Sequence, residues 1–248
     1  MHKLTIDITS KCNLDCSFCY QGSKGALSPE YILSHVDGYN PRIVEIGGGE
    51  PLLYSNFSEL LGDLAERGKQ IRIATNGTVL PEMENWPKNQ ILMQVSLPAL
   101  DPKLYEKITG KNLVNRVTEN IKKFGRNFRT AINVPLYKDN FGEVGKIADF
   151  AKKNDIRAVF GLVVPVGKAK NLELLDEKQI RELKRYAFEQ VFSGAPVDCG
   201  LIHHKKCQLF ENYYNIPKTE QCPVDAGEKI YIAPNGQIGK CEFIREGN

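Results

Sequence analysis

The chain has 248 residues, of which 42% are hydrophobic and 25% are charged. These values are typical of one or two globular domains and exclude a disordered chain. The 33 basic and 30 acidic side chains give a formal net charge of +3, which is too small to favour a nucleic-acid partner. The longest apolar run, residues 158–166, is too short to cross a bilayer, and the N-terminus lacks the apolar core of a signal peptide. We therefore expect a cytoplasmic protein without a membrane partner.

Short apolar runs that are predicted to be strands alternate with amphipathic runs that are predicted to be helices. The predicted strands are Lys3–Ser10, Ile43–Gly47, Gln70–Thr75, Ile91–Leu97, Arg129–Pro135 and Ala158–Val164, and the helical runs include Phe57–Arg67, Lys103–Phe124, Gly142–Asn154 and Asp176–Phe192. Repeated βα units predict a parallel sheet with right-handed connections and outer helices. Six units are fewer than the eight of a closed barrel. The predicted fold class is therefore α/β, an open and partial (β/α)6 TIM-like barrel.

Polar residues alternate with apolar ones along several predicted strands. In the first strand, Thr5, Asp7 and Thr9 share one face. The same phase is followed in later strands by Glu45, Arg72, Gln94 and Ser96. Parallel strands buried on both faces are usually continuous apolar runs. The alternation indicates either a polar lumen that faces a polar ligand or an internal network, for example between Glu45 and Arg72.

The pattern changes after residue 195, where cysteines, tyrosines and turn signals become frequent. Lys229–Ala233 and Gln237–Lys240 flank a Pro-Asn-Gly turn and predict a β-hairpin. We expect residues 1–195 to form the partial barrel and residues 196–248 to form a small Cys-rich β-hairpin appendage. Because the appendage has little apolar core, we expect a metal to stabilise it.

The seven cysteines fall into two groups, Cys12, Cys16 and Cys19 near the start and Cys199, Cys207, Cys222 and Cys241 near the end. In a reducing compartment, cysteines are more often metal ligands or redox groups than disulfides. The spacing of three and then two residues in the first group does not match the four paired ligands of a structural zinc site. Three thiolates on a 4Fe–4S cluster leave one iron open to an exchangeable ligand.

The segment from Cys12 to Tyr20 resembles the CxxxCxxC signature of the radical S-adenosylmethionine (radical SAM) superfamily. Gly47–Pro51, which follows the second predicted strand, resembles that family's motif for the amino group of S-adenosylmethionine (SAM). Glycines allow a ligand to approach the backbone, and their carbonyls can accept hydrogen bonds from an ammonium group. The resemblance implies a SAM-binding 4Fe–4S cluster on the first three cysteines. It also implies cofactor contacts at Gly48, Gly49, Glu50, Thr75, Asn76, Ser96, Asn133 and Val164.

One departure from the family pattern concerns the SAM carboxylate. Many relatives have an arginine after the fourth strand, and the aligned stretch here, residues 105–110, has threonine at that place. Lys107 and Lys111 are the nearby cations that could substitute.

The late cysteines resemble the core of the SPASM and twitch extensions. Cys222 is followed after thirteen residues by Gly236, and Cys241 comes four residues later. The resemblance implies a second, auxiliary 4Fe–4S cluster, with Cys199 and Cys207 completing four ligands, in a truncated version of the pattern. A zinc site on the same cysteines, or one cysteine left as a hydrogen-atom or thiol donor, remains open.

The resemblance implies a radical SAM enzyme that reductively cleaves SAM to a 5′-deoxyadenosyl radical, which then abstracts a hydrogen atom from the substrate. A flavodoxin- or ferredoxin-type reductant is the implied partner. We expect a peptide substrate, modified for example by epimerisation or crosslinking, and we expect no leader-binding domain before Lys3. A small molecule in cofactor or antibiotic biosynthesis is the alternative. An iron–sulfur electron-transfer or metal-binding protein is the alternative of another class, although such a protein has no need of the Gly47–Pro51 motif.

Overall fold

The computed structural model describes residues 2–192, 197–199, 214, 226–241 and 243. Its strands are β1 (Lys3–Thr9), β2 (Ile43–Gly48), β3 (Gln70–Thr75), β4 (Ile91–Ser96), β5 (Arg129–Leu136), β6 (Arg157–Leu162), β7 (Val197–Cys199), β8 (Lys229–Ile232) and β9 (Ile238–Gly239). Its α-helices are α1 (Pro29–Tyr39), α2 (Phe57–Glu66), α3 (Pro102–Thr109), α4 (Val114–Asn127), α5 (Val144–Lys153) and α6 (Glu177–Phe192). Short 3₁₀ helices cover Pro51–Leu53, Lys88–Gln90, Lys138–Glu143 and Gly167–Asn171.

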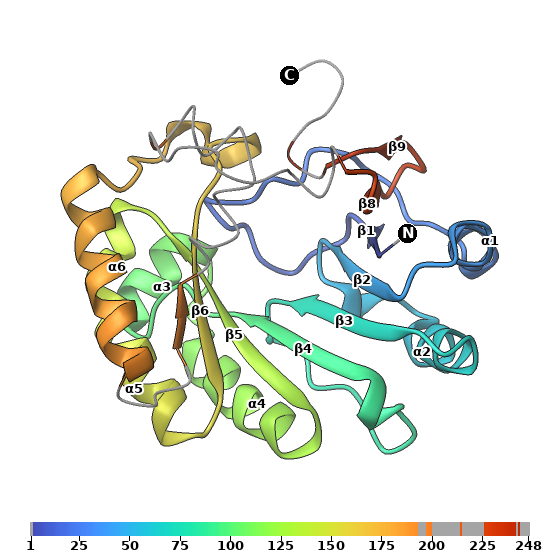
Figure 1. The fold of residues 1–248 in the computed structure, drawn as a ribbon, viewed down its shortest axis with the longest axis horizontal. Helices are drawn as coiled ribbons and strands as arrows, with labels where there is room; N and C mark the ends of the chain where they lie inside the picture. The colour runs from blue at the N-terminus through green and yellow to red at the C-terminus, as the bar shows by residue number, and fades with distance from the viewer. Residues whose placement is uncertain (1, 193–196, 200–213, 215–225, 242, 244–248) are drawn as a thin grey trace.

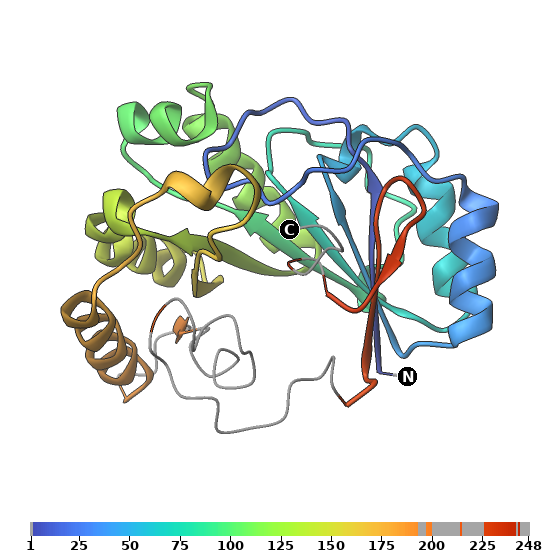
Figure 2. The same cartoon turned by 90° about the horizontal axis from the view of Figure 1, so that it is seen from above.

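The described strands form a single sheet in the order β7-β6-β5-β4-β3-β2-β1-β8-β9. The seven strands from β1 to β7 are paired in parallel, each with its neighbour in sequence. Figures 1 and 2 show the helices on the outer side of this curved sheet, with α1 and α2 beside its first strands and α3 to α6 beside its later ones. The predicted α/β class, a partial and open barrel, is confirmed.

The two faces of the sheet differ in composition because neighbouring side chains on a strand point to opposite sides. On the outer face, Leu4, Ile6 and Ile8 of β1 are fully buried in the core beneath the helices. On the inner face, Thr5 and Asp7 lie in register with Glu45 and Gly47 of β2. The alternation in the sequence therefore separates the helix-packed core from a polar lumen.

The predicted C-terminal hairpin is present, and its place was not foreseen. β8 pairs with β9 in antiparallel fashion and with β1 in parallel, so the hairpin extends the barrel sheet. At the other edge, β7 pairs with β6 and adds a further parallel strand to the six that were predicted. The described parts of residues 196–248 thus lie on both edges of one sheet. The domain boundary at residue 195 stays a prediction.

Local signals explain where the helices begin and end. Helix α1 begins after Ser28, whose hydroxyl accepts a hydrogen bond from the Tyr31 amide. The predicted single helix Lys103–Phe124 is wrong, because it is divided into α3 and α4. Gly110, at φ 79°, ends α3 in the left-handed conformation that glycine adopts without strain.

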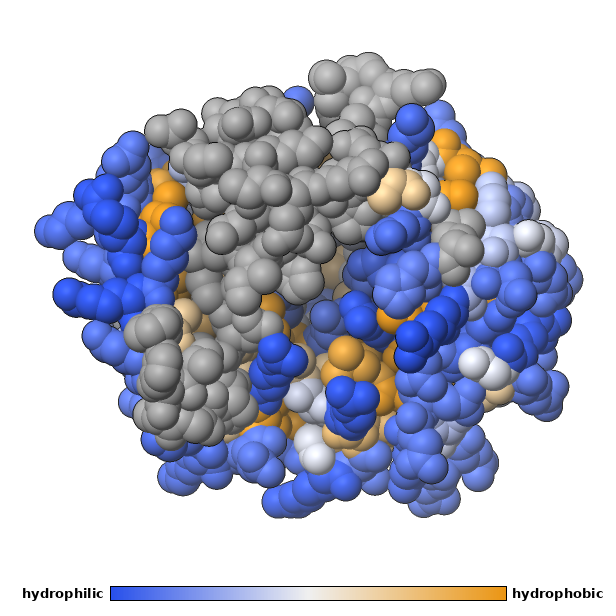
Figure 3. Space-filling model, in the orientation of Figure 1, coloured by the Kyte–Doolittle hydropathy of each residue, from blue (hydrophilic) through white to orange (hydrophobic). Residues whose placement is uncertain are grey.

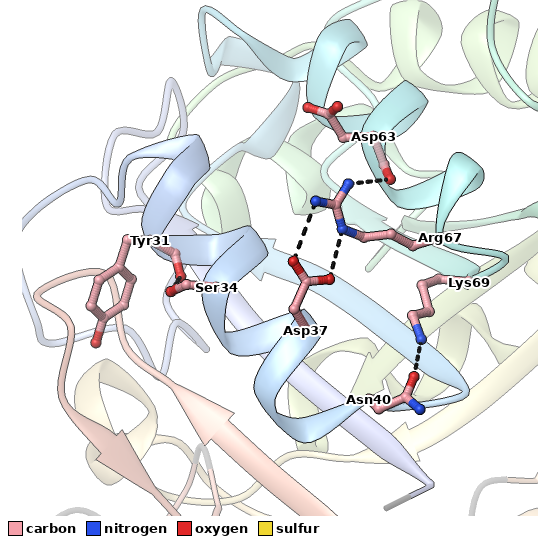
Figure 4. Close-up of polar contacts among 7 residues, drawn as sticks. All are labelled: Tyr31, Ser34, Asp37, Asn40, Asp63, Arg67 and Lys69. Carbon is pink, nitrogen blue, oxygen red and sulfur yellow. Dashed lines mark hydrogen bonds and ion pairs between the residues drawn. The ribbon is translucent and has the colours of Figure 1, made fainter.

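Helices α1 and α2 are joined by polar contacts at their C-terminal ends, as Figure 4 shows. Arg67 donates to both carboxylate oxygens of Asp37, at 2.8 and 3.3 Å, and to the carbonyl of Asp63. The Lys69 ammonium donates to the side-chain oxygen of Asn40. Because the Arg67–Asp37 pair is partly exposed, its contribution to stability is small, although it does join two helices that contact β1 and β3.

Figure 3 shows one face of the molecule. The described residues on that face are largely hydrophilic, and its hydrophobic groups form small, separate patches. Leu80 and Ile238 are the large hydrophobic side chains exposed among all the described residues. No helix within the part of the chain that the structure describes is both long and apolar enough to cross a membrane.

Candidate active site

The three early cysteines lie on a loop between β1 and α1 that is closed at its base by main-chain contacts. The Ser10 amide donates to the Gly25 carbonyl at 2.8 Å, and Thr9 and Ala26 form an antiparallel bridge. Further along, the amides of Asp15 and Ser17 donate to carbonyls of α3, at 3.0 and 2.8 Å. We call residues 10–26 the cysteine loop. Its two ends and its middle are therefore all held by the barrel.

The cysteine loop forms one wall of a cavity of about 620 Å³ at the carboxyl ends of the parallel strands. This volume lies in the range of small-molecule and cofactor sites. Many of the predicted site residues line it, namely Cys12, Cys16, Cys19, Gly48, Gly49, Thr75, Asn76, Ser96 and Asn133. Thus predicted site residues from five separate segments of the chain are brought together at one place. A smaller cavity of about 250 Å³ lies between α5 and α6 and contains no cysteine.

The glycine run after β2 is in direct main-chain contact with the start of the cysteine loop. The Gly49 amide donates to the Thr9 carbonyl at 2.7 Å, and the Glu50 amide donates to the Lys11 carbonyl at 2.8 Å. A Cβ atom on Gly49 would lie 2.3 Å from the Lys11 carbonyl oxygen. Gly48 has φ 121°, which other residues rarely adopt. Glycine is thus required here by the close approach of two backbones as well as by any ligand.

Glu50 does not line the cavity, because its side chain is fully buried beneath it. Its carboxylate accepts hydrogen bonds from the Leu52 amide at 3.0 Å, the Thr75 hydroxyl at 2.7 Å and the Asn76 amide at 2.7 Å. Burial raises the pKa of Glu50, and these hydrogen bonds offset that effect only in part. The structure therefore places Glu50 as the connection between the loops after β2 and β3.

The loop after β3 contacts the cysteine loop through Asn76. Its side-chain amide donates to the Asn13 side-chain oxygen at 2.9 Å and lies 3.8 Å from the Cys12 sulfur. Asn13 in turn donates to the Thr78 hydroxyl at 2.7 Å. A hydrogen bond from an amide to a thiolate stabilises the negative charge on sulfur, so the Asn76 amide is near enough to stabilise a thiolate at Cys12.

The turn after β6 closes the cysteine loop from the other side. The Lys168 amide donates to the Cys19 carbonyl at 2.9 Å, and the Lys168 ammonium pairs with Asp15. A Cβ atom on Gly167 would lie 2.6 Å from the Cys19 carbonyl oxygen. Val164, predicted as a cofactor contact, is buried in the core and does not line the cavity.

The wall opposite the cysteine loop consists of neutral polar side chains on β4 and β5. Ser96 and Asn133 are register partners, and Gln94 lies on the same face of β4. Within the described part of the chain, the side chains of these three residues make no hydrogen bond to another protein group, although many other polar side chains near the cavity do. They are therefore available to a bound molecule.

Other polar residues of the inner face form the internal network that was the alternative interpretation. Glu45 pairs with Lys3 at 2.8 Å. Burial raises the pKa of Glu45, but Lys3, Lys229 and Arg72 more than compensate and hold it below its usual range. An internal network therefore forms at Glu45, with Lys3 as its ion-pair partner in place of the expected Arg72, while a polar ligand in the lumen stays a prediction.

The chemistry of the three thiols fits a 4Fe–4S cluster. Burial, together with the neighbouring Cys12 and Cys19 thiols, raises the pKa of Cys16 to about 12, and burial also raises the pKa of Cys19. A bound cation replaces those protons and removes the repulsion between thiolates. Among the described residues, no three His, Cys, Asp or Glu side chains are placed to bind a single metal ion. A cluster of four irons spans a wider set of thiolates than one ion does.

The structure describes two of the four late cysteines. Cys199 ends β7, and Cys241 is buried after β9, so these two lie at opposite edges of the sheet. Cys207 and Cys222 fall outside the described residues, and the auxiliary cluster stays a prediction. The two cations that could have bound the SAM carboxylate do not line the cavity: Lys107 pairs with Asp139, and Lys111 is also absent from the lining.

Sequence reasoning missed the role of Asp7, although it placed Asp7 on the inner face of β1. This carboxylate is fully buried and accepts hydrogen bonds from Tyr20, Gln21 and Tyr231. Two of these donors flank the cavity and the third lies 224 residues away on β8. Only the alternation of polar residues in β1 hinted at a special environment.

Comparison with known families agrees with this geometry. Residues 6–151 match the family described as the radical SAM superfamily. That segment is more than half of the chain and contains the cysteine loop, the glycine run, the end of β1 and the strands from β2 to β5. The chain therefore belongs to the radical SAM superfamily.

Individual relatives share part of their length with this chain. A "Probable GTP 3′,8-cyclase" of Sulfurisphaera tokodaii is 31% identical over 189 residues, which are 71% of this chain and 60% of that protein. The same name is given to a Methanosarcina mazei protein that is 30% identical over 98% of this chain and 78% of its own length. The chain spans about three fifths of the length of the first of these relatives.

Solved structures extend the likeness of the fold to nearly the whole chain. Streptococcus suis SuiB, in a structure bound to its precursor peptide SuiA, superposes with a TM-score of 0.80. The two chains are 22% identical, and the match covers 99% of this chain and 61% of SuiB. At this identity the comparison supports the fold alone.

Proposed function

We propose that this chain binds a 4Fe–4S cluster through Cys12, Cys16 and Cys19 and uses it to cleave SAM reductively. The observation that carries the proposal is the single cavity that collects these thiols with Gly48, Gly49 and Asn76. When bound, the reduced cluster supplies the electron that breaks the sulfonium bond of SAM, giving methionine and a 5′-deoxyadenosyl radical, which takes a hydrogen atom from substrate.

The residues around the cavity have distinct tasks in this proposal. The carbonyls of the glycine run accept hydrogen bonds from the SAM ammonium, and Asn76 stabilises charge on the Cys12 sulfur. Gln94, Ser96 and Asn133 orient the rest of the cofactor and the substrate from the opposite wall. The cysteine loop, which the turn at Gly167 holds at Cys19, forms one wall of the cavity and in this proposal limits the access of water to reactive species.

For the substrate we favour a small polar molecule, because the matched relatives are named GTP 3′,8-cyclases. The neutral polar wall of Gln94, Ser96 and Asn133 suits such a molecule. A peptide remains the second candidate. The fold likeness to SuiB is compatible with it and does not by itself favour it.

The late cysteines are proposed to bind a second cluster, with Cys241, Cys207 and Cys222 as the first candidates. Cys199 is the weaker candidate because its strand lies at the far edge of the sheet from Cys241. A flavodoxin- or ferredoxin-type protein is the proposed reductant. A pure electron carrier would not need the glycine run or the unpaired polar wall opposite it.

The first experiment is an iron, sulfide and zinc count per chain after anaerobic purification and reconstitution. About four irons support the N-terminal site alone, and about eight support a second cubane cluster. The reconstituted protein is then reduced with dithionite in the presence of SAM, with and without GTP, and 5′-deoxyadenosine is quantified. Faster formation with GTP and a new GTP-derived product support the small-molecule proposal. Zinc without iron–sulfur absorption contradicts the proposed chemistry.

A further inference from the structure

The C-terminal hairpin and the cysteine loop meet at one buried carboxylate, that of Asp7 on β1. The Tyr231 hydroxyl donates to its Oδ2 atom at 2.7 Å, and the Gln21 amide donates to the same atom at 2.7 Å. The Tyr20 hydroxyl lies 3.2 and 3.3 Å from the two carboxylate oxygens. All three donors are neutral groups, and Asp7 is fully buried. A buried carboxylate depends strongly on such donors, so each of them is held in place by it.

The position of Asp7 ties this cluster to the wall of the cavity. Tyr20 follows Cys19 directly in the chain, and both Tyr20 and Gln21 line the cavity. A Cβ atom on Gly47 would lie 3.0 Å from the Asp7 carboxylate, so the end of β2 packs on the same group. A shift of Asp7 would therefore move Tyr20 and Gln21, the part of the cysteine loop that directly follows its third thiol.

The hairpin contacts the cysteine loop at two further points. A Cβ atom on Gly25 would lie 2.4 Å from the Pro234 carbonyl oxygen, so the hairpin turn rests against the base of the loop. Beyond β9, the Phe243 ring packs edge-on against Tyr20 with 5.6 Å between the ring centroids. Figure 2 shows the hairpin beside β1 and the segment that leads back to α1.

We propose that Asp7 is a positioning residue that couples the hairpin β8–β9 to the cysteine loop, so that Tyr231 helps to hold Tyr20, Gln21 and the adjacent Cys19 in place. Any effect of this coupling on SAM binding rests on the proposed function. Its effect on the position of the cysteine loop does not, because the contacts at Asp7 are present in the chain without any cofactor.

The test compares two variants, Tyr231→Phe and Tyr31→Phe, each of which removes one tyrosine hydroxyl. Tyr231→Phe removes the hairpin's contact with Asp7. Tyr31→Phe is the matched control, because the Tyr31 hydroxyl also contacts the hairpin, donating to the Gly236 carbonyl at 2.9 Å, but does not reach Asp7. Alkylation rates of Cys16 and Cys19 are measured by peptide mass spectrometry on folded, metal-free protein at a fixed pH. Melting temperatures establish that each variant is folded.

We expect Tyr231→Phe to raise the alkylation rates at least about threefold and Tyr31→Phe to change them less than about 1.5-fold. Asp7→Asn should exceed the effect of Tyr231→Phe. Tyr20→Phe, made in the loop, should in turn raise hydrogen–deuterium exchange in residues 229–232, because coupling is reciprocal. The Tyr20→Phe variant keeps the proposal testable even if the Tyr231→Phe protein does not fold.

Equal alkylation rates in the Tyr231→Phe and Tyr31→Phe proteins, or unchanged exchange in the hairpin of the Tyr20→Phe protein, would overturn the coupling. On reconstituted protein, the SAM dissociation constant should rise at least about threefold for Tyr231→Phe and stay unchanged for Tyr31→Phe. If wild-type protein binds neither iron nor SAM, the proposed function fails, while the metal-free alkylation experiment still decides the coupling.

Discussion

The two walls of the cavity are built differently. The wall formed by the cysteine loop and the loops after β2 and β3 is held by main-chain hydrogen bonds, by close approaches of glycine and by buried Glu50. The wall on β4 and β5 presents Gln94, Ser96 and Asn133 on regular strands, and within the described residues their side chains are not engaged. The geometry of the first wall is thus fixed by contacts within the protein, whereas the hydrogen-bonding side chains of the second wall remain available to a ligand.

This difference predicts that the two walls have different functions. A cluster and the SAM group bound to it require fixed positions, and backbone contacts supply them at low entropic cost. A substrate is recognised by side chains, which can differ between relatives without disturbing the fold. Substitutions in the first wall should therefore affect folding and cofactor binding together, while substitutions in the second should affect binding alone.

The largest effect is expected from Cys16→Ala. Loss of one of three thiolates should reduce bound iron at the N-terminal site from about four to below one per chain, and SAM cleavage should fall at least about 1000-fold. Iron analysis and 5′-deoxyadenosine formation measure both. Cys241→Ala is the matched control, and it should keep the N-terminal iron. Full iron and cleavage in the Cys16→Ala protein would refute the assignment of the first wall as the cluster site.

Gly49→Ala should be the next most damaging change, because its Cβ atom would lie 2.3 Å from the Lys11 carbonyl oxygen. We expect the free energy of unfolding to fall by about 2 kcal/mol and SAM affinity to fall about tenfold. Gly62→Ala in α2, where a Cβ atom meets nothing within 4 Å, is the control. It should stabilise the protein by about 0.5–1 kcal/mol. Urea unfolding and equilibrium dialysis test both variants, and similar behaviour of the two would contradict the backbone argument.

Glu50→Gln tests the buried connection within the first wall. At acidic pH the protonated carboxyl of Glu50 offers nearly the same single carbonyl acceptor as glutamine, so we expect the variant to lose less than about 1 kcal/mol there. Because burial raises the pKa of Glu50 above its unfolded value, its stabilising contribution is complete below the unfolded pKa and is lost as pH rises through the folded pKa. The wild type's stability advantage over the variant should therefore shrink as the pH rises from about 4.5, the ordinary pKa of a Glu carboxyl, into the alkaline range.

The measurement for Glu50→Gln is urea unfolding of both proteins across that pH range. A stability difference that stays constant with pH would show that Glu50 does not titrate differently in the folded state. A difference that grows with pH would show that the hydrogen bonds outweigh burial.

Asn133→Ala should have the smallest effect on the fold and an effect confined to binding. Asn133 is exposed on β5, so stability should change by less than about 0.5 kcal/mol, while ligand affinity falls about fivefold. Asn120→Ala is the matched contrast, because buried Asn120 donates to the Gly77 carbonyl at 2.9 Å. It should cost about 1–2 kcal/mol of stability. Equal destabilisation by the two changes would erase the distinction between the walls.

Much of the fold follows from patterns that span only a few residues. Apolar runs separated by amphipathic stretches predicted β1 to β6 with ends correct to within about two residues. The Cys12–Cys19 spacing and the Gly47–Pro51 run predict residues that the structure places in the first wall. The sequence also predicts the helical periodicity of α3 and α4, but it does not predict the break at Gly110, because the helical pattern continues on both sides of it.

What the sequence determined by itself was the local chemistry: which segments form strands, which loop carries the thiols and which turn must be glycine. Only the tertiary structure decided that β8 pairs in parallel with β1, that Glu50 turns into the core and that Tyr231 reaches Asp7. The physical reason is the distance along the chain over which each signal acts. Periodicity and spacing depend on neighbours in the chain, whereas the partner of a buried carboxylate depends on which distant segment packs against it. Sequence alone carries no signal for that choice.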